Sequence, residues 1–189
     1  KIKNLCLAGG VALNCVANGK ILKEKLIKNI WIQPAAGDAG GSIGAALGYW
    51  YHELEKPREQ FKDQMKGSYL GPRFENNFIE TELKSLKAKY KKYSREEIIN
   101  LTAKELAREK TVGWFQGRME FGPRALGARS ILADPRSEKM QKELNIKIKF
   151  RESFRPFAPS VLREDVNEWF ELDNDSPYML LVSEVKKDK

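Results

Sequence analysis

Four arginines fall within the segment QGRMEFGPRALGARSILADPR, residues 116–136, which also contains three glycines and two prolines. They are Arg118, Arg124, Arg129 and Arg136. A guanidinium group is planar and can bind two oxygens of one phosphate or carboxylate, and a charge-assisted hydrogen bond of this kind contributes about 1.5–3 kcal/mol. We therefore predict that this segment binds phosphate groups.

Further cations follow this segment. Lys149 and Arg151 share one face of a predicted extended stretch, because side chains at i and i+2 point the same way, and Arg155 comes four residues later. The alternative is a set of surface ion pairs, each of which contributes little to stability. The carboxylates available for such pairs are Glu120, Glu138, Glu143 and Glu152. Lysine would serve those pairs equally well, so the use of arginine favours anion binding.

Two glycine-rich turns each follow a predicted buried strand. Gly9 and Gly10 precede one predicted helix, and Asp38 lies among glycines before another. Such turns let a phosphate or ribose approach backbone amides at a helix N-terminus, although tight strand-to-helix packing explains them equally well. Asp38 is either an N-cap or a carboxylate directed at a metal or a magnesium-bound phosphate. His52 is the only histidine, and we expect it at the surface, so this chain alone cannot form an imidazole-rich metal site.

These turns indicate an α/β architecture, because strand, glycine turn and helix occur twice. The predicted elements are a strand over 2–8, a helix over 11–24, a strand over 30–33 and a helix over 42–54. Residues 55–77 are polar and rich in Gly and Pro, which predicts a linker.

The second half begins with a predicted capping box, Ser94 and Glu97, at the start of a helix. After it we predict a strand over 111–117, an irregular loop with a short helix, a helix over 137–147, an edge or irregular strand over 154–162 and a final strand over 176–185. The aromatic residues Trp114, Phe115 and Phe121 lie in or near the strand pattern and are expected in the core.

The composition indicates a globular protein of one large or two small domains, with 189 residues, 41% hydrophobic and 32% charged. We expect a soluble cytoplasmic protein with no membrane segment, and Cys6 and Cys15 as buried structural thiols. Residues 111–163 hold eleven Lys/Arg and five Asp/Glu (net +6), whereas 164–189 hold three and eight. A basic region beside an acidic one predicts a polyanionic ligand. The lysines at 84, 87, 89, 91 and 92 are predicted to line a solvated helix face. Both ends look cut, so we expect a longer parent protein.

Four stretches closely resemble the O-carbamoyltransferases of the nodulation-factor and cephamycin type (NodU/CmcH). They are LCLAGGVALNCVANGKI, IQPAAGDAGGSIGAAL, FQGRMEFGPRALGARSILADPR and LNIKIKFRESFRPFAPSVL, in the family's order. The resemblance implies that residues 1–66 are the C-terminal part of an actin-like (ASKHA) ATPase-fold domain, like that of the threonylcarbamoylation metalloproteins. It implies that residues 67–189 are the N-terminal part of a YrdC-like domain.

In that family the YrdC-like domain is understood to form carbamoyl-adenylate from ATP and carbamoyl phosphate, and the other domain passes the carbamoyl group to a small-molecule hydroxyl. By position, the resemblance assigns Gly9, Gly10 and Asn14 to nucleotide binding and Asp38 to a divalent metal such as iron or zinc. It implies catalytic roles for Arg118, Lys149 and Arg151. Anion binding by Arg124, Arg129 and Arg155 is predicted from the residue types themselves. The metal-binding histidines and the Ser-x-Asn half of the YrdC-like anion site would lie outside this sequence. ATP, with Mg²⁺, and carbamoyl phosphate are thus the expected ligands, and a homodimer is the candidate assembly.

Two other functions stay open. Related domains carbamoylate tRNA or a protein cysteine during hydrogenase maturation. An RNA-binding module is the alternative from another class, supported by the basic region and the nearby aromatic residues, and it predicts nucleic-acid affinity that falls steeply with salt. We rank nucleic acid below a small phosphorylated ligand because the aromatic residues follow a strand pattern.

Overall fold

The computed structural model describes residues 3–59, 63–172 and 175–189. The chain forms two compact units, each built from separate stretches of sequence. Unit 1 comprises residues 1–71, 120–126 and 161–189, and unit 2 comprises residues 72–119 and 127–160. None of the helices in the described ranges is long and apolar enough to span a membrane.

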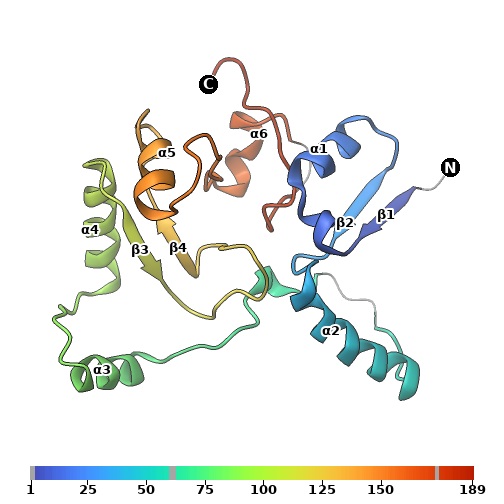
Figure 1. The fold of residues 1–189 in the computed structure, drawn as a ribbon, viewed down its shortest axis with the longest axis horizontal. Coiled ribbons are helices and arrows are strands. Elements are labelled where there is room, and N and C mark those ends of the chain that lie inside the picture. Colours follow the sequence, from blue (N-terminus) through green and yellow to red (C-terminus); the bar gives the residue numbers. More distant parts are fainter. Residues whose placement is uncertain (1–2, 60–62, 173–174) are drawn as a thin grey trace. The chain divides into compact units, whose positions relative to one another are not determined.

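Unit 1 is built on two parallel strands, β1 (Asn4–Leu7) and β2 (Asn29–Ile32), paired from Asn4 with Asn29 to Leu7 with Ile32. A 3-10 turn (Gly10–Leu13) and α1 (Cys15–Lys23) follow β1, and α2 (Asp38–Gly48) follows β2 and continues as a π-helical turn, Tyr49–Glu53 (Figure 1). The predicted repeat of strand, glycine turn and helix is therefore confirmed, and the chain is a mixed α/β protein.

The core of unit 1 joins the glycine turns to the C-terminal stretch. Its buried members are Ala12, Ile32, Ala36 and Leu180. Asn18 of α1, only 2% exposed, donates from Nδ2 to the carbonyl oxygens of Ala12 (2.8 Å) and Leu180 (3.1 Å). These bonds satisfy a buried amide and fix the C-terminal stretch against α1.

The predicted final strand over 176–185 is wrong. This stretch has no strand and makes one isolated bridge, Val185 with Phe170. Met179 has a φ of 54°, which interrupts an extended conformation. The Leu180 carbonyl oxygen of this stretch accepts a hydrogen bond from the Asn18 side chain rather than from a neighbouring strand. Nearby lie the 3-10 turn Arg163–Asp165 and α6 (Val166–Trp169).

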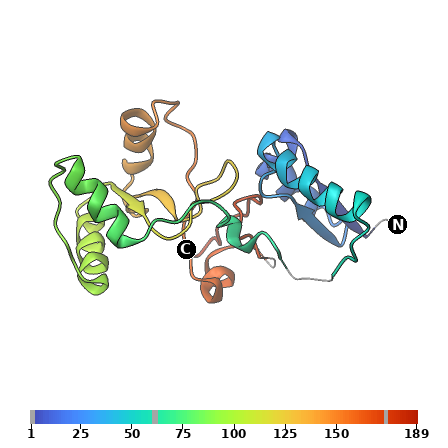
Figure 2. The same ribbon diagram turned by 90° about the horizontal axis from the view of Figure 1, so that it is seen from below.

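Unit 2 contains α3 (Asn76–Ser85), α4 (Arg95–Ala107) and an antiparallel pair, β3 (Val112–Phe115) with β4 (Arg129–Leu132). Figure 2 shows α3 and α4 in green and the two strands in yellow and orange. The helix α5 (Met140–Glu143) continues as a π-helical turn, Leu144–Ile148. The predicted capping box is confirmed: Ser94 Oγ accepts from the Glu97 amide (3.2 Å), and Glu97 Oε2 accepts from the Ser94 amide (2.7 Å).

Three predictions of secondary structure within residues 84–162 are wrong. The helix α3 ends at Ser85, so the lysines at 87–92 lie in the connection to α4 and form no helix face. Residues 116–128 contain no helix, and residues 154–162 contain no strand. Two prolines in the latter remove amide donors that a strand would need.

Side-chain burial also departs from expectation. Cys6 is exposed and Cys15 is half-buried, so Cys6 is not a buried thiol. Phe115 is 58% exposed and is not a core residue, while Trp114 and Phe121 are half-buried. His52 is exposed, as expected.

Candidate functional site

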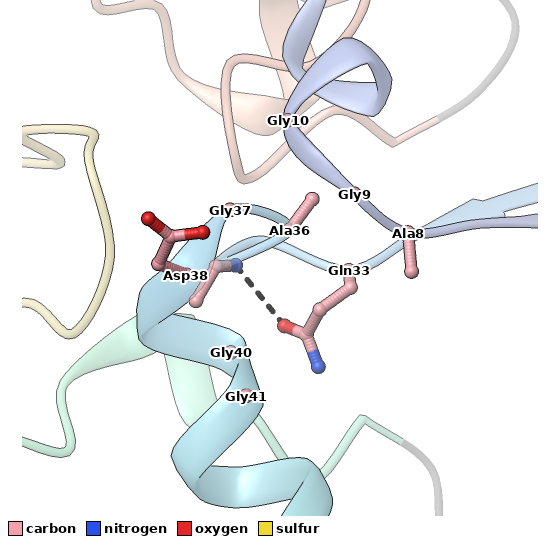
Figure 3. Close-up of a pocket in the computed structure, with 10 residues that line it drawn as sticks. Ala8, Gly9, Gly10, Gln33, Ala36, Gly37, Asp38, Gly40 and Gly41 are labelled. Carbon is pink, nitrogen blue, oxygen red and sulfur yellow. Dashed lines mark hydrogen bonds between the residues drawn. The ribbon is translucent and has the colours of Figure 1, made fainter.

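The two glycine turns of unit 1 meet at one cavity. The carboxyl ends of parallel strands lie at the same edge of a sheet, so the turns after β1 and β2 are neighbours. Between them is an open cavity of about 390 Å³ (Figure 3). It is lined by Ala8, Gly9, Gly10, Gln33, Ala35, Ala36, Gly37, Asp38, Gly40 and Gly41. Gly9, Gly10 and Asp38 therefore line one cavity, and their roles in nucleotide and metal binding stay predictions.

Backbone geometry holds the two turns in contact. Gly9 has φ 94° and ψ 160°, a conformation that residues with a Cβ rarely adopt, and its amide donates to the Ala36 carbonyl at 2.8 Å. A Cβ added to Gly40 would lie 2.2 Å from the Ala35 carbonyl oxygen, so only glycine allows α2 to begin so close to β2. The glycines thus shape a cavity whose walls are largely backbone.

Asp38 lies in the first turn of α2, where a carboxylate is stabilised by the helix dipole. Gly37 is the N-cap, so the interpretation of Asp38 as the N-cap is wrong. Among the described residues, no three His, Cys, Asp or Glu side chains gather where they could hold a metal ion. The resemblance places the other metal ligands outside this sequence, so the assignment of Asp38 to a divalent metal stays a prediction.

Asn14 has a local structural role. It is the N-cap of α1, and its Oδ1 accepts a hydrogen bond from the Ala17 amide at 3.1 Å. It is not among the residues that line the cavity. Its assignment to nucleotide binding stays a prediction.

Gln33 is a cavity residue that the sequence reasoning missed. It directly follows β2, and its Oε1 accepts a hydrogen bond from the Ala35 amide at 3.1 Å (Figure 3). The signal that could have found it is its position, because ligands of α/β sheets bind at the carboxyl ends of the strands.

Arg124 belongs to unit 1, apart from the other predicted anion-binding residues. Its Nη2 donates to the Leu13 carbonyl at 2.8 Å, at the end of the 3-10 turn that follows Gly9. Its Nε is buried and has no hydrogen-bond partner among the described residues. Glu120, 6% exposed, accepts from the Leu126 amide at 2.7 Å and closes the stretch that carries Arg124. The motif of four arginines is thus divided between the two units.

Arg129 and Arg136 are engaged within unit 2. Arg129 donates to the carbonyl oxygens of Gln116 (2.9 Å) and Ala128 (2.8 Å), and its Cζ lies 3.3 Å from the centre of the Phe115 ring. Arg136 pairs with Asp134, with Nη2 and Oδ2 2.6 Å apart, and holds the pKa of that carboxyl at about 2. These contacts stabilise the hairpin and the turn after it. Arg118 is exposed in the turn after β3.

Lys149, Arg151 and Arg155 lie on a loop organised by Asn145, which is fully buried. The Asn145 side chain donates from Nδ2 to the carbonyl oxygens of Ser153 (3.1 Å) and Arg155 (2.8 Å) and accepts from Arg151 Nε at 2.6 Å. A single amide therefore fixes both the loop and the guanidinium group of Arg151. Asn145 was also missed, because its partners lie six to ten residues away.

The three cations of this loop differ in the contacts that their charged groups make. The Arg151 guanidinium carbon lies 4.9 Å from the centre of the Phe157 ring, and Nε is used by Asn145, so the described residues leave its two terminal nitrogens available. Arg155 forms an exposed ion pair with Glu152 at 2.8 Å, as the ion-pair alternative predicted. Lys149 is exposed. Arg151 has the geometry of an anion ligand, held at one edge and open at the other.

Comparison with family models gives two matches in chain order. Residues 1–47 match the model of the carbamoyltransferase N-terminus, and residues 103–189 match that of the carbamoyltransferase C-terminus.

Individual relatives agree with these matches. The chain is 62% identical over 190 residues to an uncharacterised protein of Synechocystis, covering 99% of this chain and 31% of that protein. It is 44% identical to nodulation protein NolO of Bradyrhizobium diazoefficiens (98% and 34%) and 35% identical to nodulation protein U of Rhizobium fredii (97% and 29%). The chain thus spans about a third of the length of these relatives.

Proposed function

Because this chain belongs to the carbamoyltransferase family, we propose that its full-length protein transfers a carbamoyl group from carbamoyl phosphate to an acceptor hydroxyl, with ATP as co-substrate. The proposal includes an actin-like architecture for residues 1–66 and a YrdC-like one for residues 67–189. The support from the structure is the Arg151 guanidinium, which Asn145 orients with its terminal nitrogens open.

The first proposed step forms carbamoyl-adenylate. Water hydrolyses carbamoyl phosphate to carbamate and inorganic phosphate, and a carbamate oxygen then attacks the α-phosphorus of ATP. The bond from that phosphorus to the bridging oxygen breaks, and pyrophosphate leaves. Negative charge develops on the phosphoryl oxygens, where a fixed guanidinium stabilises it without reorganising. Arg151 would fill this role, with Lys149 and Arg118 as further cations.

The second proposed step transfers the carbamoyl group. The acceptor hydroxyl attacks the carbamoyl carbon, the bond to the adenylate oxygen breaks, and AMP leaves with the electron pair, while the hydroxyl proton passes to solvent or a base.

The cavity between the glycine turns would bind nucleotide phosphates, because the first amides of α2 have no acceptor within their helix. No nucleophilic side chain is required.

Carbamoyl-phosphate-dependent exchange of labelled pyrophosphate into ATP tests the first step. We expect exchange in the full-length protein and a loss of about a hundredfold or more in Arg151→Ala, the cost of one lost charge-stabilising contact in the transition state. Arg118→Ala tests the second cation. Arg108→Ala is the matched control, because Arg108 is an exposed arginine of unit 2 paired with Glu105. Exchange that ignores the Arg151 substitution contradicts the proposed role.

Carbamoylation of an RNA acceptor is the second candidate, and exposed aromatic residues favour it. Phe150 and Phe154, 86% and 77% exposed, alternate with the cations of the Asn145 loop, an arrangement typical of stacking platforms for single-stranded nucleic acid. This candidate predicts that the affinity for RNA falls steeply as the salt concentration rises from about 50 to 200 mM. It also predicts weaker RNA binding in Phe150→Ala. A site for one small anion predicts instead that the affinity for RNA does not depend on the length of the RNA.

A further inference from the structure

Gln33 lines the cavity of unit 1, and the Oε1 atom of its side-chain amide has a fixed partner, the Ala35 backbone amide. We infer that Gln33 is a phosphate-binding residue of this cavity, which donates hydrogen bonds from Nε2 to phosphoryl oxygens of a nucleotide. This inference rests on the proposed use of ATP. It adds a binding residue to a cavity in which the family resemblance assigned only Gly9, Gly10 and Asp38.

The orientation of the amide group follows from its neighbour. The Ala35 backbone N–H can only donate, so the atom 3.1 Å from it must be the acceptor, Oε1. Nε2 is therefore the outer atom. In Figure 3 it points away from the turn, and the Asp38 carboxylate extends to the other side of the loop.

The remaining cavity wall offers little else to a phosphate. Apart from Gln33 and Asp38, its lining residues are all alanine or glycine, so their polar groups are those of the backbone. A triphosphate needs several donors, and a neutral amide can donate two hydrogen bonds without the desolvation cost of a buried cation. Gln33 is the lining residue whose side chain can supply them.

A purely structural role for Gln33 predicts a different response to substitution. If Gln33 serves only to hold the turn through the Ala35 bond, Gln33→Glu should be harmless, because a carboxylate oxygen accepts the same bond. If Nε2 binds phosphate, Gln33→Glu removes both donors and places an acceptor against the ligand. The variant thus keeps the turn and changes only the outer atom.

We would titrate full-length wild type, Gln33→Glu and Gln33→Leu with ATP and with tripolyphosphate, and follow hydrogen–deuterium exchange in peptides covering residues 33–48. This readout reports the cavity itself and is independent of catalysis or of ATP bound elsewhere. Gln64→Glu is the matched control, because Gln64 is an exposed glutamine of unit 1 outside the cavity.

We expect ligand protection in wild type and Gln64→Glu, and at least about tenfold weaker apparent affinity for both ligands in Gln33→Glu, with exchange of the unliganded peptides unchanged. Equal affinity in wild type and Gln33→Glu would overturn the inference, as would a loss for ATP without a loss for tripolyphosphate. An absence of protection in wild type would overturn the proposed nucleotide site together with the inference.

Discussion

The Oδ1 atom of Asn145 accepts a hydrogen bond from Nε of Arg151 at 2.6 Å, while its Nδ2 holds the carbonyl oxygens of Ser153 and Arg155. Both N–H donors of this buried amide and one of the two lone pairs of its oxygen are therefore used. The position of the Arg151 guanidinium depends on the packing of residue 145 rather than on the exposed loop that carries it.

Asn145→Ala should therefore damage both the fold of unit 2 and the proposed first step. Two carbonyl oxygens and one guanidinium lose a partner, which should lower the free energy of unfolding by about 1–3 kcal/mol. Urea unfolding measures this change, and pyrophosphate exchange measures the second effect. Asn100→Ala is the control, since Asn100 is an exposed residue of α4, and it should change stability by less than about 0.5 kcal/mol. Exchange that is normal in Asn145→Ala would show that Arg151 needs no such support.

Asp134 should make stability depend on pH in the acid range. Hydrogen bonds from Arg136 lower the pKa of Asp134 from 3.8 to about 2. A carboxyl whose folded pKa is lowered stabilises the fold fully above its unfolded pKa, and this contribution is lost as the pH falls through 2. The difference in unfolding free energy between wild type and Asp134→Asn should shrink from pH 5 to pH 2. Arg136→Ala should show the same shrinking difference, and a constant difference in both would refute the assignment.

Two glycines of α2 should respond oppositely to alanine. At Gly40 a Cβ would meet the Ala35 carbonyl at 2.2 Å, whereas at Gly44 it would meet nothing within 4 Å. We expect Gly40→Ala to destabilise unit 1 by about 1–3 kcal/mol through overpacking, and Gly44→Ala to stabilise α2 by about 0.5–1 kcal/mol through its helix propensity. Hydrogen exchange of the α2 amides distinguishes the two. A stable, protected α2 in Gly40→Ala would show that the turn can open without cost.

The capping box of α4 gives a local test of unit 2. Ser94→Ala removes the acceptor for the Glu97 amide and should cost about 0.5–2 kcal/mol. Ser85→Ala serves as the comparison, because Ser85 lies in the last turn of α3 and its Oγ donates to the Glu82 carbonyl. Thermal unfolding should show a clearly lower Tm for Ser94→Ala than for Ser85→Ala. Equal Tm values would mean that α4 does not depend on its cap.

The features predicted well from the sequence are those determined by neighbouring residues. The capping box needs only Ser94 and Glu97, and each glycine turn needs only its own backbone, so both were predicted correctly. The stretch 176–185 looked like a strand because it is apolar, yet its conformation depends on Asn18, which lies more than 150 residues away in the chain. Burial of Leu180 satisfies the apolar pattern without a strand ladder.

The candidate sites show the same division. The cluster of arginines was evident in the sequence, but the different hydrogen-bond partners of its members were not. Arg129 donates to carbonyl oxygens in and next to its own hairpin, and Arg124 donates to the Leu13 carbonyl oxygen. Gln33 and Asn145 are ordinary polar residues in the sequence. Each becomes important only through which atoms its amide group contacts, and that is decided by the fold.

The interleaving of the two units limits how the protein can be divided. Unit 1 takes its residues from three stretches of chain, and Arg124 and Leu180 each contact the first of these from a distant stretch. No single cleavage of the polypeptide can release the glycine turns together with everything that packs against them. A gene split at one point would divide the residues of unit 1 between two polypeptides, which would have to associate before unit 1 could complete its core.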